Sequence, residues 1–141
     1  MSETNPTAVA ENPDEVVTQA RVHYFPMPLG AGTMALITLD NGHDHTRPST
    51  FGPGGLASIN EALDEIAART DVAAVGVTGK PFVFAVGADL SATSLVNDPA
   101  IISAFGKFGH DVMRRFGEFS IPTFAFVNGA AMGGGLELAL H

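Results

Sequence analysis

The 141-residue sequence contains no cysteine, no tryptophan and a single tyrosine. The absence of cysteine excludes a disulfide-stapled fold, a thiolate zinc site and a cysteine nucleophile, and it fits a reducing compartment. No early segment joins a basic start to a long apolar run, so neither a signal peptide nor a membrane-spanning helix is expected. The sequence therefore predicts a soluble cytoplasmic protein that does not interact with membranes.

Basic residues are also scarce, because 7 Lys and Arg face 15 Asp and Glu, for a formal net charge of −8. This balance argues against a surface that follows nucleic-acid phosphates and against a polybasic membrane patch. Hydrophobic residues make up 45% of the chain, which is enough to bury a core and differs from the composition of disordered proteins. At this length, one domain is the natural count.

The first 17 residues are rich in Ser, Thr, Asn, Pro and Glu and show no apolar period. Residues 1–17 are therefore predicted to form a disordered tail, and residues 18–141 the folded domain. Two β-rich runs, 21–24 and 34–39, are separated by turn-forming residues and predict a hairpin. The short apolar runs 72–78, 82–86 and 123–127 predict further strands.

Two segments repeat apolar residues at helical spacing. The first is predicted to run from position 56 to about 69, with one apolar face made of Leu56, Ile59, Leu63 and Ile66. The second is predicted over 99–119, with one face made of Ile101, Phe105, Phe108, Val112, Phe116 and Phe119. A third helix is expected to begin near Gly134. Strands that alternate with helices indicate an α/β layered domain.

Two glycine-containing segments depart from ordinary core patterning. Residues 82–90 read FVFAVGADL, a strand that runs into Gly-Ala-Asp, where small side chains leave backbone N–H groups open to a ligand. Residues 127–138 read VNGAAMGGGLEL and place three glycines at the start of a helix, at a cost in conformational entropy. A helix N-terminus presents unpaired N–H groups and a partial positive charge, which suits an oxyanion.

Each segment also has a purely structural interpretation. Gly-Ala-Asp is often a plain turn with an N-capping aspartate, and three glycines can serve only to pack a helix tightly against a sheet. Glu137 is harder to explain by structure alone, because this carboxylate follows the glycines but lies between apolar neighbours. Taken separately, the segments leave both interpretations open.

Together, the two segments resemble the paired signature of the crotonase (enoyl-CoA hydratase/isomerase) superfamily, in the same order and with a helix between them. The resemblance covers about residues 22–141 and implies the family's crotonase-like spiral of ββα turns. It also implies an acyl thioester of coenzyme A as substrate, and no separate cofactor because coenzyme A is part of that substrate. The shared chemical step is stabilisation of a thioester enolate by two backbone N–H groups.

Matched motif to motif, the resemblance implies that Ala88 and Gly134 supply these N–H groups. Preorganised donors need no reorganisation when negative charge develops, and one such donor is worth roughly 3–4 kcal/mol. Glu137 matches the first catalytic carboxylate of the hydratases, which deprotonates the water that adds at C3 of a 2-enoyl thioester. The residues expected to bind the rest of the substrate are Val86, Asp89, Leu90, Ser91 and Gly133.

The sequence departs from the hydratase pattern at its end, because it stops within the helical run 136–141. Hydratases deliver a proton to C2 with a second, downstream glutamate. We therefore expect a crotonase-like domain that is incomplete at the C-terminus, the front part of a longer enzyme. The resemblance implies a parent enzyme that is a trimer-based homo-oligomer or part of a multifunctional complex. The second possibility comes from the long, polar loop 41–53, which resembles that of hydratase domains fused to a 3-hydroxyacyl-CoA dehydrogenase in fatty-acid β-oxidation.

The predicted function is hydration of 2-enoyl-CoA thioesters. Three alternatives share the same motifs: an enoyl-CoA isomerase, another acyl-CoA enzyme of the superfamily, and a non-catalytic acyl-CoA-binding fragment. No metal site is predicted, because His43, Asp44 and His45 are too close in sequence to converge readily on one ion and no fourth ligand is evident. His23 and His110 are interpreted as a strand residue and a helix-flank residue.

Overall fold

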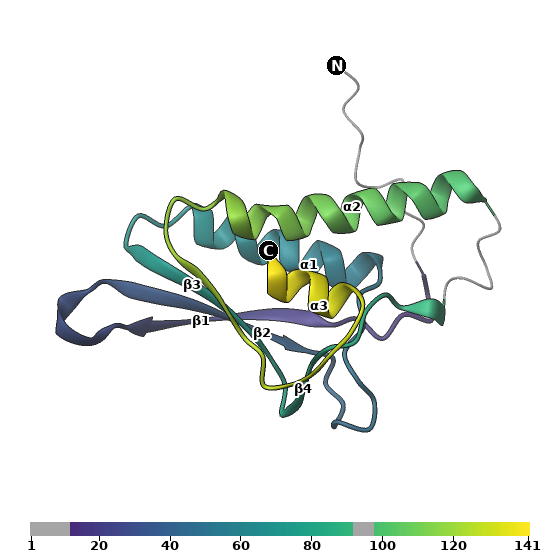
Figure 1. Ribbon diagram of the computed structural model, residues 1–141, viewed down its shortest axis with the longest axis horizontal. Helices are drawn as coiled ribbons and strands as arrows, with labels where there is room; N and C mark the ends of the chain where they lie inside the picture. The colour runs from purple at the N-terminus through teal and green to yellow at the C-terminus, as the bar shows by residue number, and fades with distance from the viewer. Residues whose placement is uncertain (1–11, 92–97) are drawn as a thin grey trace, which may run out of the picture.

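The fold opens with the predicted hairpin, as seen in a computed structural model that describes residues 12–91 and 98–141 (Figure 1). Strand β1 (Gln19–Pro26) pairs antiparallel with β2 (Thr33–Asp40), and a short 3-10 helix, η2 (Pro28–Gly30), lies between them. Side chains along β2 alternate between buried and partly exposed, as expected for a strand with one face on the core. The buried set is Ala35, Ile37 and Leu39.

The main sheet has the strand order β1-β2-β3-β5. Strand β3 (Val72–Gly79) pairs in parallel with both β2 and β5 (Thr123–Phe126). As the strand between two parallel partners, β3 is buried along most of its length, which explains its continuous apolar run. The strands predicted in these regions are confirmed.

In the described part of the chain, a second sheet of two strands is not joined to the first by strand pairing. It pairs β4 (Phe82–Ala85) in parallel with β6 (Gly129–Ala131), and the register places Val83 opposite Ala130. Strand β4 confirms the strand predicted over 82–86, whereas no strand is predicted over the residues of β6. The sequence Gly-Ala-Ala carries no apolar alternation, so only the pairing with β4 reveals it as a strand.

Three helices cover one side of the strands, and α2 is the outermost of them (Figure 1). Helix α1 (Pro53–Ala67) packs on β1 and on α2 (Pro99–Glu118), and the short α3 (Gly134–Leu140) packs on β4 and β5. The apolar face predicted for α1 is confirmed, since all four residues are buried. On α2, only the C-terminal part of the predicted face is fully buried, through Val112 and Phe116.

The segment before β1 is tied to the domain. Residues 1–11 lie outside the described residues, but the carboxylate of Glu15 accepts hydrogen bonds from the N–H groups of Gly54 and Gly55, each 2.9 Å long. The buried Thr18 hydroxyl donates to the carbonyl of Thr50 at 2.7 Å. The prediction of a disordered tail up to residue 17 is therefore wrong around Glu15, because this carboxylate satisfies unpaired N–H groups at the start of α1.

Candidate functional site

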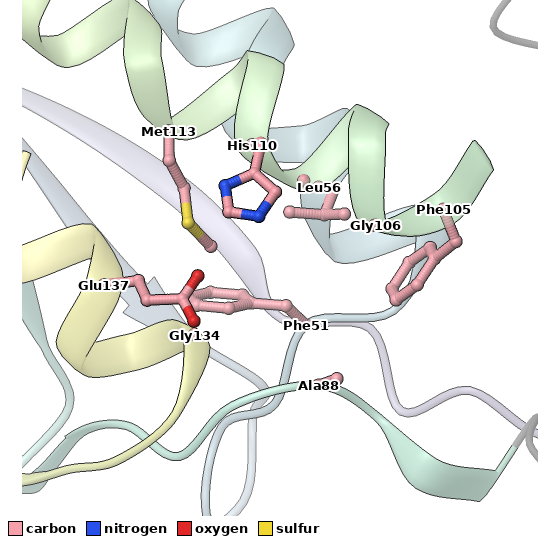
Figure 2. A pocket seen from close by; sticks show the side chains of 10 residues that line it. Phe51, Leu56, Ala88, Phe105, Gly106, His110, Met113, Gly134 and Glu137 are labelled. Atoms are coloured by element: carbon pink, nitrogen blue, oxygen red, sulfur yellow. The ribbon is translucent and has the colours of Figure 1, made fainter. Parts of the chain in front are cut away.

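A cavity of about 240 Å³ lies where α1, α2 and α3 meet the segments around positions 51 and 88 (Figure 2). It is lined by Phe51, Leu56, Ala88, Phe105, Gly106, Gly109, His110, Met113, Gly134 and Glu137. Most of these residues are apolar or small. The fold thus brings Ala88, Gly134 and Glu137 together, although they come from two segments far apart in the sequence.

The segment around Ala88 is held by backbone hydrogen bonds to residues 49–51. The N–H of Val86 donates to Ser49 O at 2.9 Å, and the N–H of Asp89 donates to Phe51 O at 2.9 Å. Gly87 accepts from the N–H of Phe51 at 2.8 Å and has a φ of +92°, which favours glycine. Between these anchors, the N–H of Ala88 has no hydrogen-bond acceptor among the described residues.

The three consecutive glycines serve three different purposes. Gly133 has a φ of +51° as the N-cap of α3, and Gly135 packs so closely on β4 that a β-carbon would lie 2.0 Å from Ala85 O. A β-carbon on Gly134 would meet nothing closer than Met113 Cε at 3.5 Å. The tight-packing interpretation therefore holds for Gly135, while Gly134 faces the cavity.

The two segments approach each other at their glycines. A β-carbon on Gly87 would lie 3.6 Å from the backbone nitrogen of Gly134. Like Ala88, Gly134 has an N–H with no acceptor among the residues that the structure describes. Two residues with unpaired backbone N–H groups thus line the same cavity, and backbone donors of this kind can stabilise a developing oxyanion.

Glu137 lies in the first turn of α3 and directs its carboxylate into the cavity (Figure 2). Its own N–H donates to Gly133 O at 3.0 Å, so its backbone position is set by the helix start. The carboxylate forms no hydrogen bond or ion pair with any described residue and is exposed to the cavity. It is therefore available to hold a proton or a water molecule.

His110 reaches the same cavity from α2, on the side opposite Glu137 (Figure 2). Its interpretation as a helix-flank residue without a site role overlooked this position. The signal was in the sequence, because positions 106, 109, 110 and 113 recur at helical spacing beside the predicted apolar face. That spacing defines a face but does not say what the face meets.

The remaining residues expected to bind substrate do not line the cavity: Val86, Asp89, Leu90, Ser91 and Gly133. Most of them adjoin Ala88 along the chain. Asp89 Oδ1 accepts from the N–H of Ser91 at 2.9 Å, and the hydroxyl of Ser91 accepts from Asn12 Nδ2 at 2.8 Å. Their expected role concerns the coenzyme A portion of the substrate and stays a prediction.

The loop 41–48 closes around one lysine. Lys80 is only 4% exposed, and its Nζ donates to Asn41 Oδ1 and to three carbonyl oxygens of the loop, at 2.5–2.9 Å: those of His43, Asp44 and Arg47. Burial lowers the pKa of the Lys80 ammonium, and the carboxylates of Asp40 and Asp44 partly oppose this effect. Since the loop leads directly into residues 49–51, Lys80 stabilises the loop that precedes the segment bonded to residues 86–89.

A second cavity, of about 290 Å³, lies beside this loop and is lined in part by His43, His45 and Lys80. The ring of His45 stands edge-on to Phe82, with the centroids 5.6 Å apart. Within residues 12–91 and 98–141, no three histidine, aspartate or glutamate side chains come together as metal ligands. The same residues include no helix with the length and hydropathy of a membrane span.

Comparison with known proteins defines the class to which this fold and cavity belong. The sequence pattern of the family described as "Enoyl-CoA hydratase/isomerase" matches residues 31–141. The chain therefore belongs to the enoyl-CoA hydratase/isomerase family, and the resemblance inferred from the two glycine segments is confirmed.

Curated relatives include the fatty acid oxidation complex subunit alpha of Shewanella halifaxensis and that of Shewanella frigidimarina, which are 36% and 34% identical over 110 residues. Each alignment covers 76% of this chain but only 15% of the relative. The chain thus spans a small part of the length of these multidomain-sized relatives.

Solved structures share the fold. DspI of Pseudomonas aeruginosa superposes with a TM-score of 0.69 at 26% identity, over 92% of this chain and 50% of that chain. An enoyl-CoA hydratase/isomerase from Xanthobacter autotrophicus Py2 gives 0.66 at 29% identity, over 87% and 44%. An enoyl-CoA hydratase from Bacillus anthracis gives 0.70 at 21% identity, over 84% and 44%. The predicted crotonase fold is confirmed.

Proposed function

We propose that this chain supplies the enolate-binding part of an active site that adds water to 2-enoyl-CoA thioesters. The observation that carries the proposal is the meeting of three groups in one cavity: the unpaired N–H groups of Ala88 and Gly134 and the free carboxylate of Glu137. The family and the names of the curated relatives support an acyl-CoA substrate and a place in fatty-acid oxidation.

In the proposed reaction, the thioester oxygen accepts hydrogen bonds from Ala88 and Gly134. Glu137 takes a proton from a water molecule as the water oxygen forms a bond to C3. The electron pair of the C2=C3 bond moves towards the thioester, and the two N–H groups stabilise the resulting enolate oxygen. C2 then takes up a proton, so that the net change is the addition of one water molecule.

The proton delivered to C2 needs a donor of its own. In the hydratases that the chain resembles, this donor is a second glutamate, and no second carboxylate lines the cavity among the described residues. The coenzyme A portion is proposed to run past the backbone of residues 86–91, which continues outward from Ala88. We further propose a trimer-based or multifunctional parent assembly, which the relatives' name of complex subunit supports.

A double-bond isomerase is the second candidate, and the single carboxylate favours it. Moving the double bond from C3=C4 to C2=C3 requires one base that takes a proton from C2, giving the enolate held by the same two N–H groups, and then returns a proton to C4. Glu137 alone can supply such a base. The two candidates differ in whether an oxygen atom enters the product.

The test uses the natural protein that carries this chain and 2-butenoyl-CoA in isotopically labelled water. Hydration gives loss of enoyl absorbance and 3-hydroxybutanoyl-CoA that contains the labelled oxygen. An isomerase leaves 2-butenoyl-CoA unlabelled but converts 3-hexenoyl-CoA to 2-hexenoyl-CoA. If neither substrate changes and neither binds, the proposed function is wrong.

A further inference from the structure

Helix α2 presents one polar side chain to an otherwise apolar wall of the cavity. His110 lies between Leu56 and Met113 and faces the carboxylate of Glu137 across the cavity (Figure 2). No hydrogen bond or ion pair joins the two side chains in the described part of the chain, and both line the same cavity. A ligand atom in this space is therefore flanked by a carboxylate and an imidazole.

The side chain of His110 is exposed, and none of the ion pairs on the neighbouring part of α2 includes it. The charged side chains on the neighbouring part of α2 satisfy one another, because Asp111 pairs with Lys107 at 2.5 Å and with Arg114 at 3.4 Å. His110 itself forms no hydrogen bond with a described residue, and histidine is not a strong helix former. Among the described residues that line the cavity, the one charged side chain opposite His110 is the carboxylate of Glu137.

We propose that His110 binds the oxygen atom that is added at C3 of the substrate. This inference rests on the proposed function, in which Glu137 holds the water that attacks C3. An imidazole has a ring N–H donor and, when neutral, a ring nitrogen acceptor. The attacking water, and later the 3-hydroxyl group, lies between the two side chains, donates a hydrogen bond to Glu137 and accepts one from His110.

If His110 binds this oxygen atom, the protein should bind an acyl-CoA with a 3-hydroxyl group more tightly than the same acyl-CoA without it. The product 3-hydroxybutanoyl-CoA and its analogue butanoyl-CoA differ only in the C3 hydroxyl group, so their relative affinities report on the group that binds this oxygen. Loss of one hydrogen bond of this kind weakens binding by about tenfold. A general disturbance of the cavity weakens both ligands equally.

The experiment measures calorimetric binding of both ligands to the natural protein that carries this chain, as wild type, His110→Phe and His110→Asn. We expect His110→Phe to lose about tenfold in affinity for 3-hydroxybutanoyl-CoA and less than twofold for butanoyl-CoA. Asparagine keeps a hydrogen-bond donor and should retain most of the preference. His23→Phe, on the exposed side of β1, is the matched control and should change neither affinity.

Two results would overturn the inference and leave the proposed function standing: a wild-type hydratase in which His110→Phe changes neither affinity, or one in which it lowers both equally. A wild-type protein that binds neither ligand and hydrates nothing would overturn both. Thermal melts of each variant check the fold, and His110→Asn supplies the comparison if the phenylalanine variant melts early.

Discussion

A β-carbon on Gly135 would stand 2.0 Å from the carbonyl oxygen of Ala85. The same carbonyl accepts a hydrogen bond from the N–H of Met132 at 3.1 Å. Helix α3 is therefore seated directly on β4, and β4 continues into the segment that carries Ala88. Gly134, at the start of α3, is thereby held near the Ala88 segment, where a β-carbon on Gly134 would lie 3.7 Å from Gly87 Cα.

Gly135→Ala should lower the free energy of unfolding by about 3 kcal/mol, because neither backbone can yield without shifting α3 off β4. Gly134→Ala should fold normally, since the nearest atom to its β-carbon is 3.5 Å away. The new methyl group would enter the cavity and reduce acyl-CoA binding. Urea unfolding and ligand titration measure the two effects, and equal stability of both variants would contradict the proposed role of the close contact.

Glu137→Gln should lower kcat by about 10²–10⁴-fold, since glutamine cannot take the proton of the attacking water. The free energy of unfolding should stay within about 0.5 kcal/mol of wild type, because the carboxylate is exposed and unpaired. Steady-state kinetics with 2-butenoyl-CoA and a urea melt check both parts. The matched control is Glu118→Gln at the exposed end of α2, and retained activity in Glu137→Gln would remove this residue from the mechanism.

Lys80→Met should cost about 2–4 kcal/mol of stability, because it leaves the oxygen of Asn41 and three loop carbonyls without their donor. The control is Lys107→Met, which removes an exposed lysine paired with Asp111 and should cost less than about 0.5 kcal/mol. Urea unfolding of both variants gives the difference. A similar cost for the two lysines would show that the loop does not depend on Lys80.

Much of the fold was predictable, because most of its helices and strands have a local pattern of apolar residues. The apolar spacing of α1 and the continuous run of β3 identified both elements, β3 to within one residue and α1 to within three residues of its bounds. Strand β6 was not predicted, because its three small residues show no alternation of apolar and polar side chains and its partner β4 lies far away in the sequence. Local patterning also could not show that β4 pairs with β6 in a separate sheet and not with the main sheet.

The candidate site also contains residues that the sequence identified and residues that it did not. Ala88, Gly134 and Glu137 were identified from two motifs, and the structure places them in one cavity. Glu15 was misjudged because its hydrogen-bond partners, Gly54 and Gly55, lie in a distant segment. The place of His110 in the cavity was missed because the opposite wall, which includes Glu137, also comes from a distant segment. A helical spacing shows that residues share a face, but only tertiary packing shows whether that face meets solvent, a core or a cavity.

Tyr24, the single tyrosine of the chain, should make the protein sensitive to alkali. Partial burial, followed by its 2.6 Å hydrogen bond to Glu65 and the charge of that carboxylate, raises the pKa of Tyr24 from 10.0 to about 12. Unfolded chains lose the phenol proton near pH 10 while folded chains retain it, so the free energy of unfolding should fall between pH 10 and 12. Tyrosinate absorbance measures the pKa directly. Tyr24→Phe should show a shallower decline in this window, and an identical decline would contradict the assignment.

Glu15→Ala should lower the free energy of unfolding by about 1 kcal/mol, since it removes the acceptor for two N–H groups at the start of α1. The N-cap residue of α1 is Gly52, which has no side chain that could accept these hydrogen bonds instead. The control is Glu61→Ala in the exposed middle of α1, which should be nearly neutral because alanine is a strong helix former. Glu15→Gln should recover part of the loss, because its amide oxygen still accepts a hydrogen bond while the favourable interaction of a negative charge with the helix N-terminus is lost. Urea melts at low and high salt separate the two contributions, and equal stability of the Glu15→Ala and Glu61→Ala variants would return residues 12–17 to the status of an unattached tail.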